Sequence, residues 1–398
     1  MDKISPNSNI YSYSKLFVYF IFLYSGLIKW IPFPIDYTLF TGLILLCFML
    51  VDIKHLKFKV AKNVETIYVI FYVFSLLYIS SITYSISTNY AEIKARGFIL
   101  NVLAFTFPIV SIRLEHCKKI IVVMSVLCAF MLSFLTFLYL NDLFIMFIMP
   151  DEEQINLFGV VIPTYLDIGT FIAVAFLLNL HTKSKTSLIL KILIFYFLIL
   201  LEGRGPLLVL ILVVIIDFWL KNRKISNYVK YLIVLIFAIS LYLYLDLDFI
   251  DFDRLNIFES SKFDVASRDR YQYINKCLEG FYNSPIFGNG IGSSGILISN
   301  HDVVLYPHNS FVEVLAELGI IGFIMYLLIY VLYLKLILFK KIPTEVMPFL
   351  LIAFYMFFQD MKSGAFEGWR ISCGWLSIAI IIAYSVVKAS NTSNKKLA

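Results

Sequence analysis

The chain has 398 residues, of which 60% are hydrophobic, 17% are aromatic and only 15% are charged. Its mean hydropathy is +0.85. Soluble globular domains carry roughly 25% charged residues, so this composition excludes the soluble classes. We predict an all-α polytopic membrane protein in which residues 1–398 form a single integral membrane domain.

Twelve apolar segments have about the length, roughly 20 residues, that a helix needs to cross a bilayer. They begin near Lys15, Asp36, Thr66, Gly97, Ile120, Val161, Leu188, Pro206, Tyr228, Phe311, Val346 and Trp369. The first segment follows a polar stretch without a small-residue cleavage site, so we interpret it as a retained span rather than a signal peptide.

Lys and Arg residues recur after every second predicted span, and short loops rich in these residues face the cytoplasm. They stand after the second, fourth, sixth, eighth and tenth spans and at the end of the chain, at positions 54–62, 113–119, 183–185, 221–224, 340–341 and 395–396. We therefore predict that both termini are cytoplasmic. The net charge of +6 follows from this topology and does not indicate nucleic-acid binding.

Residues 245–310 form by far the longest polar stretch, on the side opposite to the basic loops. We predict that this large periplasmic loop carries part of a functional site. It begins with four aspartates, at positions 246, 248, 251 and 253, which could hold a divalent cation. Because outer loops tolerate acidic residues freely, we favour a solvated, structural role for these four aspartates.

The five cysteines show neither a disulfide framework nor zinc-ligand spacing, so we predict no metal site.

Within the large loop, residues 267–282 have the apolar periodicity of an amphipathic helix, with Ser267 as its N-cap. Arg268 and Arg270 would then lie in the first turn, where cations oppose the helix dipole unless an anion binds there. Both a phosphate bound by Arg268 and a salt bridge to a neighbouring aspartate are compatible with this placement.

His308 stands where the chain returns to the membrane after this loop. Neutral imidazole can accept a proton from an attacking hydroxyl near pH 7, so His308 is a candidate general base. The alternative is that it only anchors the following span through a hydrogen bond. Asn309 is of the residue type that caps a helix N-terminus.

Two carboxylates and two glycines follow on the tenth predicted span. Glu313 and Glu317 are four residues apart and therefore project from one face of the helix. Carboxylates at membrane depth usually meet a partner or a water-filled cavity. Gly319 and Gly322 predict a close approach of another helix.

Arg204 lies in the tight outer turn Glu202-Gly203-Arg204-Gly205-Pro206 between the seventh and eighth predicted spans. It could simply extend to the membrane interface. Between two glycines and ahead of a proline, it could instead hold its guanidinium over the outer face to bind a diphosphate.

Taken together, these motifs resemble the O-antigen polymerase and O-antigen ligase superfamily. The His-Asn pair and the two glycines at 308–322 have the spacing of its His-Asn signature. Residues 204–208 resemble its Arg-three residues-Leu motif, and residues 267–271 and 283–290 resemble its loop signature, an Arg helix followed by a Pro-x-x-Gly-x-Gly turn. Tyr271 stands where the family usually has Trp, a departure that affects packing more than chemistry.

The resemblance implies a glycosyltransferase of the GT-C type at the periplasmic face of the bacterial inner membrane. Arg204 and Arg268 would bind the diphosphate leaving group, and His308 would activate the acceptor hydroxyl. Arg270, Asn309, Glu313, Glu317, Gly319 and Gly322 would support the site. Two guanidiniums can neutralise a departing diphosphate, so we expect a metal-independent reaction without a cofactor. The expected partners are an undecaprenyl-diphosphate-linked oligosaccharide, membrane lipid and a chain-length regulator protein, but no nucleic acid.

Of the two family activities we favour the O-antigen polymerase, because polymerases of this size are diverse. The O-antigen ligase, which transfers the polysaccharide to lipid A-core, is the alternative.

A lipid-linked oligosaccharide flippase belongs to a different class of protein. It predicts ionisable residues at the membrane midplane and two similar halves. Asp167, Asp217 and Asp360 lie in or at the ends of spans, but there is no internal repeat. A structural scaffold would not need outward Arg and His residues at these spacings.

Overall fold

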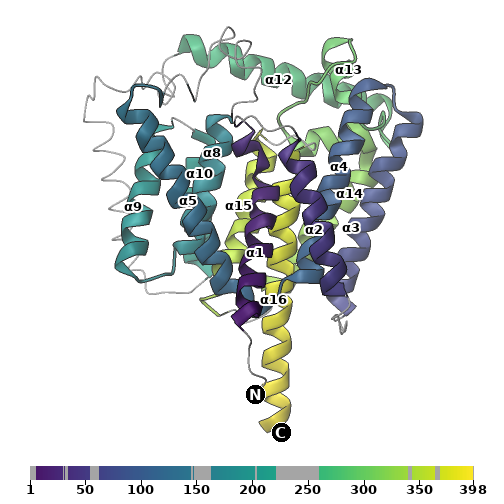
Figure 1. Ribbon diagram of the computed structural model, residues 1–398. Coiled ribbons are helices and arrows are strands. Elements are labelled where there is room, and N and C mark those ends of the chain that lie inside the picture. The colour runs from purple at the N-terminus through teal and green to yellow at the C-terminus, as the bar shows by residue number, and fades with distance from the viewer. Residues whose placement is uncertain are drawn as a thin grey trace.

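In the computed structural model, the described residues are 6–29, 31, 35–53, 62–144, 147, 163–201, 204–220, 260–338, 343–363 and 368–397. Within these ranges the regular elements are helices, without any strand. Eleven upright helices are α1 (Pro6–Leu23), α2 (Tyr37–Ile53), α3 (Lys62–Ser80), α4 (Asn89–Ser111), α5 (Cys117–Leu140), α8 (Tyr165–Asn179), α9 (Lys185–Leu200), α10 (Arg204–Leu220), α14 (Ser310–Leu338), α15 (Met347–Ser363) and α16 (Arg370–Leu397). Two more, α12 (Ser260–Asn283) and α13 (Ser293–Ser299), lie across one end of them (Figure 1).

Four helices are long and apolar enough to cross a membrane, and five shorter apolar helices accompany them among the described residues. The four long ones are Glu65–Thr83, Asn89–Ser111, Leu114–Leu140 and Ser310–Leu336. The described helices agree with the all-helical membrane class expected from composition. The total of twelve spans remains a prediction, and the ninth predicted span, near Tyr228, lies outside the described residues.

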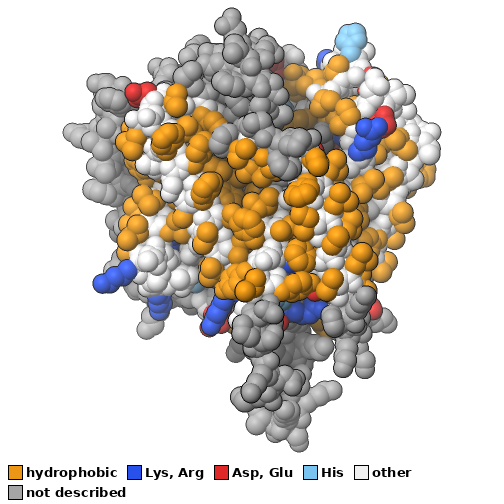
Figure 2. Space-filling model, viewed as in Figure 1, with side chains coloured by type: hydrophobic (Ala, Val, Ile, Leu, Met, Phe, Trp, Pro, Cys, Tyr) orange, Lys and Arg blue, Asp and Glu red, His pale blue; other side chains and the backbone are white. Residues whose placement is uncertain are grey.

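The two ends of the bundle differ. Both termini lie at one end, which we call the termini end, whereas α12 and α13 cover the other, which we call the loop end (Figure 1). Between the ends the surface is hydrophobic: α2, for example, exposes Leu39, Leu43, Leu46 and Leu50 at helical spacing. Figure 2 shows this as a broad orange band, with most of the visible Lys and Arg side chains near the termini end. Lipid chains tolerate such a surface, whereas water does not.

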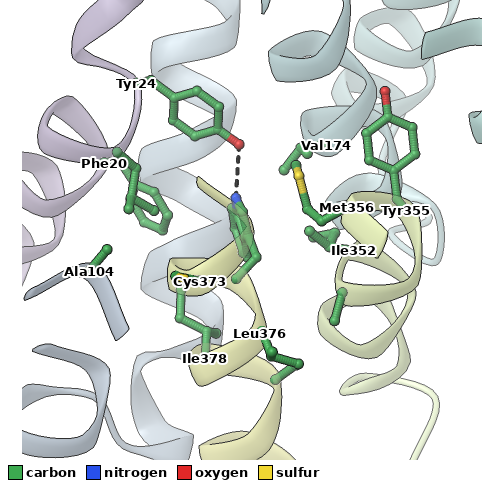
Figure 3. Packing of buried hydrophobic residues seen from close by; sticks show 14 of the residues in the cluster. Phe20, Tyr24, Ala104, Val174, Ile352, Tyr355, Met356, Cys373, Leu376 and Ile378 are labelled. Atoms are coloured by element: carbon green, nitrogen blue, oxygen red, sulfur yellow. Dashed lines mark hydrogen bonds between the residues drawn. The ribbon is translucent and has the colours of Figure 1, made fainter. Parts of the chain in front are cut away.

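Aromatic side chains fill the core, and several polar side chains there form hydrogen bonds inside the bundle. The Tyr24 hydroxyl accepts a hydrogen bond of 2.8 Å from the Trp375 indole, the dashed line in Figure 3. The Tyr19 hydroxyl donates to the Ala104 carbonyl at 2.8 Å, and the Ser377 hydroxyl donates to the Phe105 carbonyl at 2.6 Å. Because lipid offers no hydrogen bonds, these buried polar groups pair with one another inside the bundle. The same contacts hold α1, α4 and α16 together.

The amphipathic helix predicted at 267–282 exists, but its start was misplaced. α12 begins at Ser260, so Ser267 lies inside the helix and does not cap it. Arg268 therefore stands more than two turns from the helix start. Since the helix dipole acts mainly within the first turn, it gives no argument for an anion at Arg268 and Arg270.

Candidate active site

The junction that leads into α14 is held by short hydrogen bonds. The Asn309 side-chain oxygen accepts from the backbone N–H groups of Phe311 at 3.0 Å and Val312 at 3.1 Å, which confirms Asn309 as an N-cap. The Ser310 hydroxyl donates to the backbone carbonyl of Asp360 at 2.5 Å. The start of α14 is thereby fixed against the end of α15.

His308 occupies an uncommon backbone conformation directly before this cap. Its φ is +54°, in the left-handed region that residues with a Cβ seldom adopt. The imidazole is half-buried, and its ring centroid lies 4.4 Å from that of Tyr306. The fixed backbone and the neighbouring ring together orient the imidazole.

The electrostatic surroundings keep the His308 imidazole neutral. Burial and the positive charge of Arg270 lower its pKa below the ordinary value. An unperturbed histidine has a pKa of about 6.5, so the His308 ring is unprotonated at pH 7 and can accept a proton. The charge of Arg270 on α12 therefore acts on the imidazole of His308.

Helix α14 is broken at Gly319, where φ is 62° and ψ is −161°. The loop at 285–290 fills the break. The backbone N–H groups of Asn289 and Gly290 donate to the carbonyls of Ala316 and Glu317, each at 2.9 Å. In return, the N–H of Ile320 donates to the carbonyl of Pro285 at 2.9 Å. Backbone groups that the break would leave unpaired in the membrane are therefore paired with the loop.

Both sides of this contact require glycine. A Cβ on Gly288 would lie 2.4 Å from the Glu317 carbonyl carbon, and a Cβ on Gly319 would lie 2.4 Å from the Ile286 carbonyl oxygen. The close partner predicted for Gly319 is therefore a loop and not another helix. At Gly322 the nearest atoms belong to Leu318 of the same helix, 2.2 Å from a built Cβ.

The connection between α3 and α4 holds the same loop from another side. The Ser81 hydroxyl accepts from the Ile291 N–H at 3.0 Å, and the Ser85 hydroxyl donates to the Ile291 carbonyl at 2.6 Å. Further along, the Asp302 carboxylate caps α4 by accepting from the N–H groups of Thr88 and Asn89, both at 2.8 Å. A hydrogen bond from Ser87 and these amide donors hold the pKa of Asp302 well below its usual range.

A buried ion cluster lies under the loop. Lys94 of α4 places its Nζ 2.5 Å from a carboxylate oxygen of Glu313 and 2.5 Å from one of Glu317, and all three side chains are 0% exposed. The Tyr78 hydroxyl donates to Glu317 at 3.4 Å, and Lys94 donates to the Ser294 hydroxyl at 3.3 Å. The two glutamates thus meet a cationic partner, which joins α4, α13 and α14.

Sequence reasoning misses Lys94 because it places the fourth span from Gly97 onward, whereas α4 begins at Asn89. A lysine a few residues into an apolar helix is the signal that could have revealed the cluster. Asp360 is also more closely tied to the site than its sequence position indicates: its carboxylate accepts from the Ser372 hydroxyl at 2.9 Å, and its carbonyl binds Ser310 of the His308 junction.

Residues 189–327 match the family model described as O-Antigen ligase. This segment belongs to the O-antigen ligase and polymerase superfamily. The match confirms the resemblance stated from the motifs at 204–208, 267–271, 283–290 and 308–322, all of which it contains. No curated protein matches the chain.

Within this superfamily segment, the two arginines expected to bind diphosphate are described only in part. The helical backbones of Arg204, at the start of α10, and Arg268, in α12, are described, whereas their side chains lie outside the described set. The aspartates at 246–253 also lie outside it. Among the residues that are described, no group of three or more His, Cys, Asp or Glu could hold a metal ion.

Replacement of Gly319 by Ala should destabilise the superfamily segment. The added Cβ meets the Ile286 carbonyl oxygen at 2.4 Å, and a residue with a Cβ is strained by about 1–3 kcal/mol in this backbone conformation. Thermal unfolding in detergent should show a lower Tm for Gly319→Ala. The matched control is Gly26→Ala, because a Cβ there has nothing within 4 Å. An equal Tm for the two variants would contradict the role of the break.

Replacement of Lys94 by Met should cost about 3–5 kcal/mol, because it leaves two buried carboxylates without their cation. The control is Arg96→Met on the same helix, whose ion pair with Glu92 is exposed and contributes at most about 1 kcal/mol. Adding Glu313→Gln and Glu317→Gln to Lys94→Met should recover part of the lost Tm. If Lys94→Met is no more destabilising than Arg96→Met, the cluster does not stabilise the fold.

Proposed function

We propose that the protein is an O-antigen polymerase, which joins undecaprenyl-diphosphate-linked oligosaccharide units at the periplasmic face of the bacterial inner membrane. The observation that carries the proposal is the half-buried imidazole of His308, which lies directly before the Asn309 cap of α14 and against the ring of Tyr306. Burial and the charge of Arg270 lower its pKa, which suits a base. The match to the O-Antigen ligase family supports glycosyl transfer as the chemistry. The loop end would face the periplasm, since the predicted cytoplasmic loops are the basic ones.

In this mechanism, His308 takes the proton of the acceptor hydroxyl while the hydroxyl oxygen attacks the anomeric carbon of the donor sugar. The bond between that carbon and the diphosphate oxygen breaks, and undecaprenyl diphosphate leaves with the bonding electrons. Arg204 and Arg268 would neutralise the charge that develops on the diphosphate. The reaction would need no metal, because the two guanidiniums supply the positive charge.

The O-antigen ligase is the second candidate, favoured by the description of the matched family. It would use the same base and the same leaving group, with lipid A-core as the acceptor. A flippase draws less support from the structure. Asp167 bonds the Thr164 hydroxyl at 2.8 Å within the first turn of α8, and Asp217 lies 3.4 Å from His181, so these two carboxylates have local partners near helix ends.

Deletion of the gene separates the candidates by the surface polysaccharide seen on a gel. Core that carries a single repeat unit indicates a polymerase. Bare core with accumulated lipid-linked polymer indicates a ligase. Repeat units that remain on the cytoplasmic side would contradict both and support the flippase.

Replacement of His308 by Asn should lower turnover by about 10²–10⁴-fold, the usual contribution of a general base. Asn tolerates the left-handed backbone conformation, so the loss would not reflect misfolding. Turnover of a lipid-linked donor by the purified variant, at a protein level and Tm equal to those of the wild type, provides the measurement. Undiminished turnover would refute the role as a base.

The acid limb of the pH profile tests the electrostatic effect of Arg270 on His308. A base must be neutral, so activity is lost as pH falls through the pKa of His308, which lies below its ordinary value. Arg270→Gln removes a positive charge that lowers this pKa, and the acid limb should therefore move to higher pH. Arg270→Lys keeps the charge and is the control. If the acid limb of Arg270→Gln lies at the same pH as that of the wild type, the charge of Arg270 does not affect the pKa of His308.

A further inference from the structure

A groove runs between α1 and α5 on the outer surface of the bundle, away from the candidate active site. Its volume is about 500 Å³, and it is lined by Tyr13, Ser14, Phe17, Val18, Val122, Val123 and Val126. This volume falls within the range of about 300–1,000 Å³ that is usual for small-molecule sites. The groove therefore has room for part of a lipid molecule.

The walls of the groove suit a hydrocarbon chain. Phe17 is 47% exposed, Val122 is 49% exposed and Val126 is 61% exposed, so apolar surface faces outward from both helices. Ser14 supplies the only side-chain hydroxyl apart from that of Tyr13 among the lining residues. From Val122 to Val126 the groove follows α5 for about 6 Å, a length that part of an extended acyl chain can occupy.

A cation stands at the end of the groove nearest the starts of both helices. The Lys119 ammonium lies 3.0 Å from the Asn9 side-chain oxygen and 5.5 Å from the ring centroid of Tyr13, a lining residue. Lys118 is exposed beside it. Neither lysine forms an ion pair with any residue that the structure describes, whereas Lys15 nearby is paired with Asp52 at 2.9 Å.

We propose that this groove binds an anionic phospholipid from the leaflet at the termini end. One acyl chain would lie along Phe17, Val122 and Val126, and the headgroup phosphate would be bound by Lys119 with Lys118 beside it. A zwitterionic lipid fits the same apolar walls, but its net neutral headgroup gains less from the two cations. The site is therefore selective for negative charge, and it does not depend on the reaction proposed above.

The test is native mass spectrometry of the purified full chain in detergent with an equimolar mixture of phosphatidylglycerol and phosphatidylethanolamine. The wild type should retain phosphatidylglycerol preferentially. Lys119→Gln should lower that preference about fivefold, as expected for one lysine near an anionic headgroup. Val122→Trp, which fills the groove, should lower the retention of both lipids.

Lys335→Gln is the matched control, because Lys335 is an exposed lysine of α14, a helix that does not line the groove. It should retain phosphatidylglycerol as the wild type does. Equal retention of the two lipids by the wild type would overturn the proposal. So would an unchanged preference in Lys119→Gln, or an equal loss in Lys119→Gln and Lys335→Gln. If Val122→Trp does not fold, Lys119→Gln alone decides.

Discussion

The insertion of the loop at 285–290 into the broken helix α14 is the contact on which the loop end depends. A helix interrupted inside a membrane leaves carbonyl and N–H groups that lipid cannot satisfy, at a cost of several kcal/mol for each group. Here the loop supplies partners to Ala316, Glu317 and Ile320. The break and the loop therefore exist only together, and glycine is required on each side because the two backbones touch.

Around this contact, three further interactions fix the loop end of the bundle. Asp302 caps α4, Ser81 and Ser85 bind Ile291, and Lys94 joins Glu313 to Glu317 beneath them. None of these groups acts on a substrate in the mechanism proposed. Their effect is to fix the loop and α13 against α4 and α14. Helix α12 is attached to this assembly through the hydrogen bond that the Asn289 side-chain amide donates to the Gly280 carbonyl at 3.0 Å.

Features that depend on neighbouring residues were readable from the sequence, and features that depend on distant ones were not. Asn309 was identified as a cap because a cap bonds N–H groups two and three residues ahead. The motif at 308–322 pointed to the family because its spacing is fixed along the chain. By contrast, the partner of Gly319 is a loop some thirty residues earlier in the chain. The spacing of residues within α14 does not predict this contact.

Two errors have the same physical origin, the difficulty of placing helix ends. The start of α12 at Ser260 was missed because the apolar periodicity becomes clear only after Ser267. The sequence pattern places Lys94 outside a span, because the apolar run starts at Gly97 and the helix begins with a polar first turn at Asn89. At α4, tertiary contacts of its first turns with Asp302 and with Glu313 and Glu317 extend the helix beyond the segment that its own hydrophobic pattern defines.

The break at Gly319 also separates α14 into two parts with different surroundings. The part before it belongs to the loop assembly, whereas the part after it, with Ile324, Leu328 and Val331 exposed, faces lipid. Bilayers of different thickness make a spanning helix tilt. At Gly319 the hydrogen-bond ladder is interrupted, and a tilt of the lower part would reach the upper part through the bonds that the loop makes to Ala316, Glu317 and Ile320. The loop thereby ties the part of α14 that carries the cap at Asn309 to the part that exposes apolar side chains to lipid.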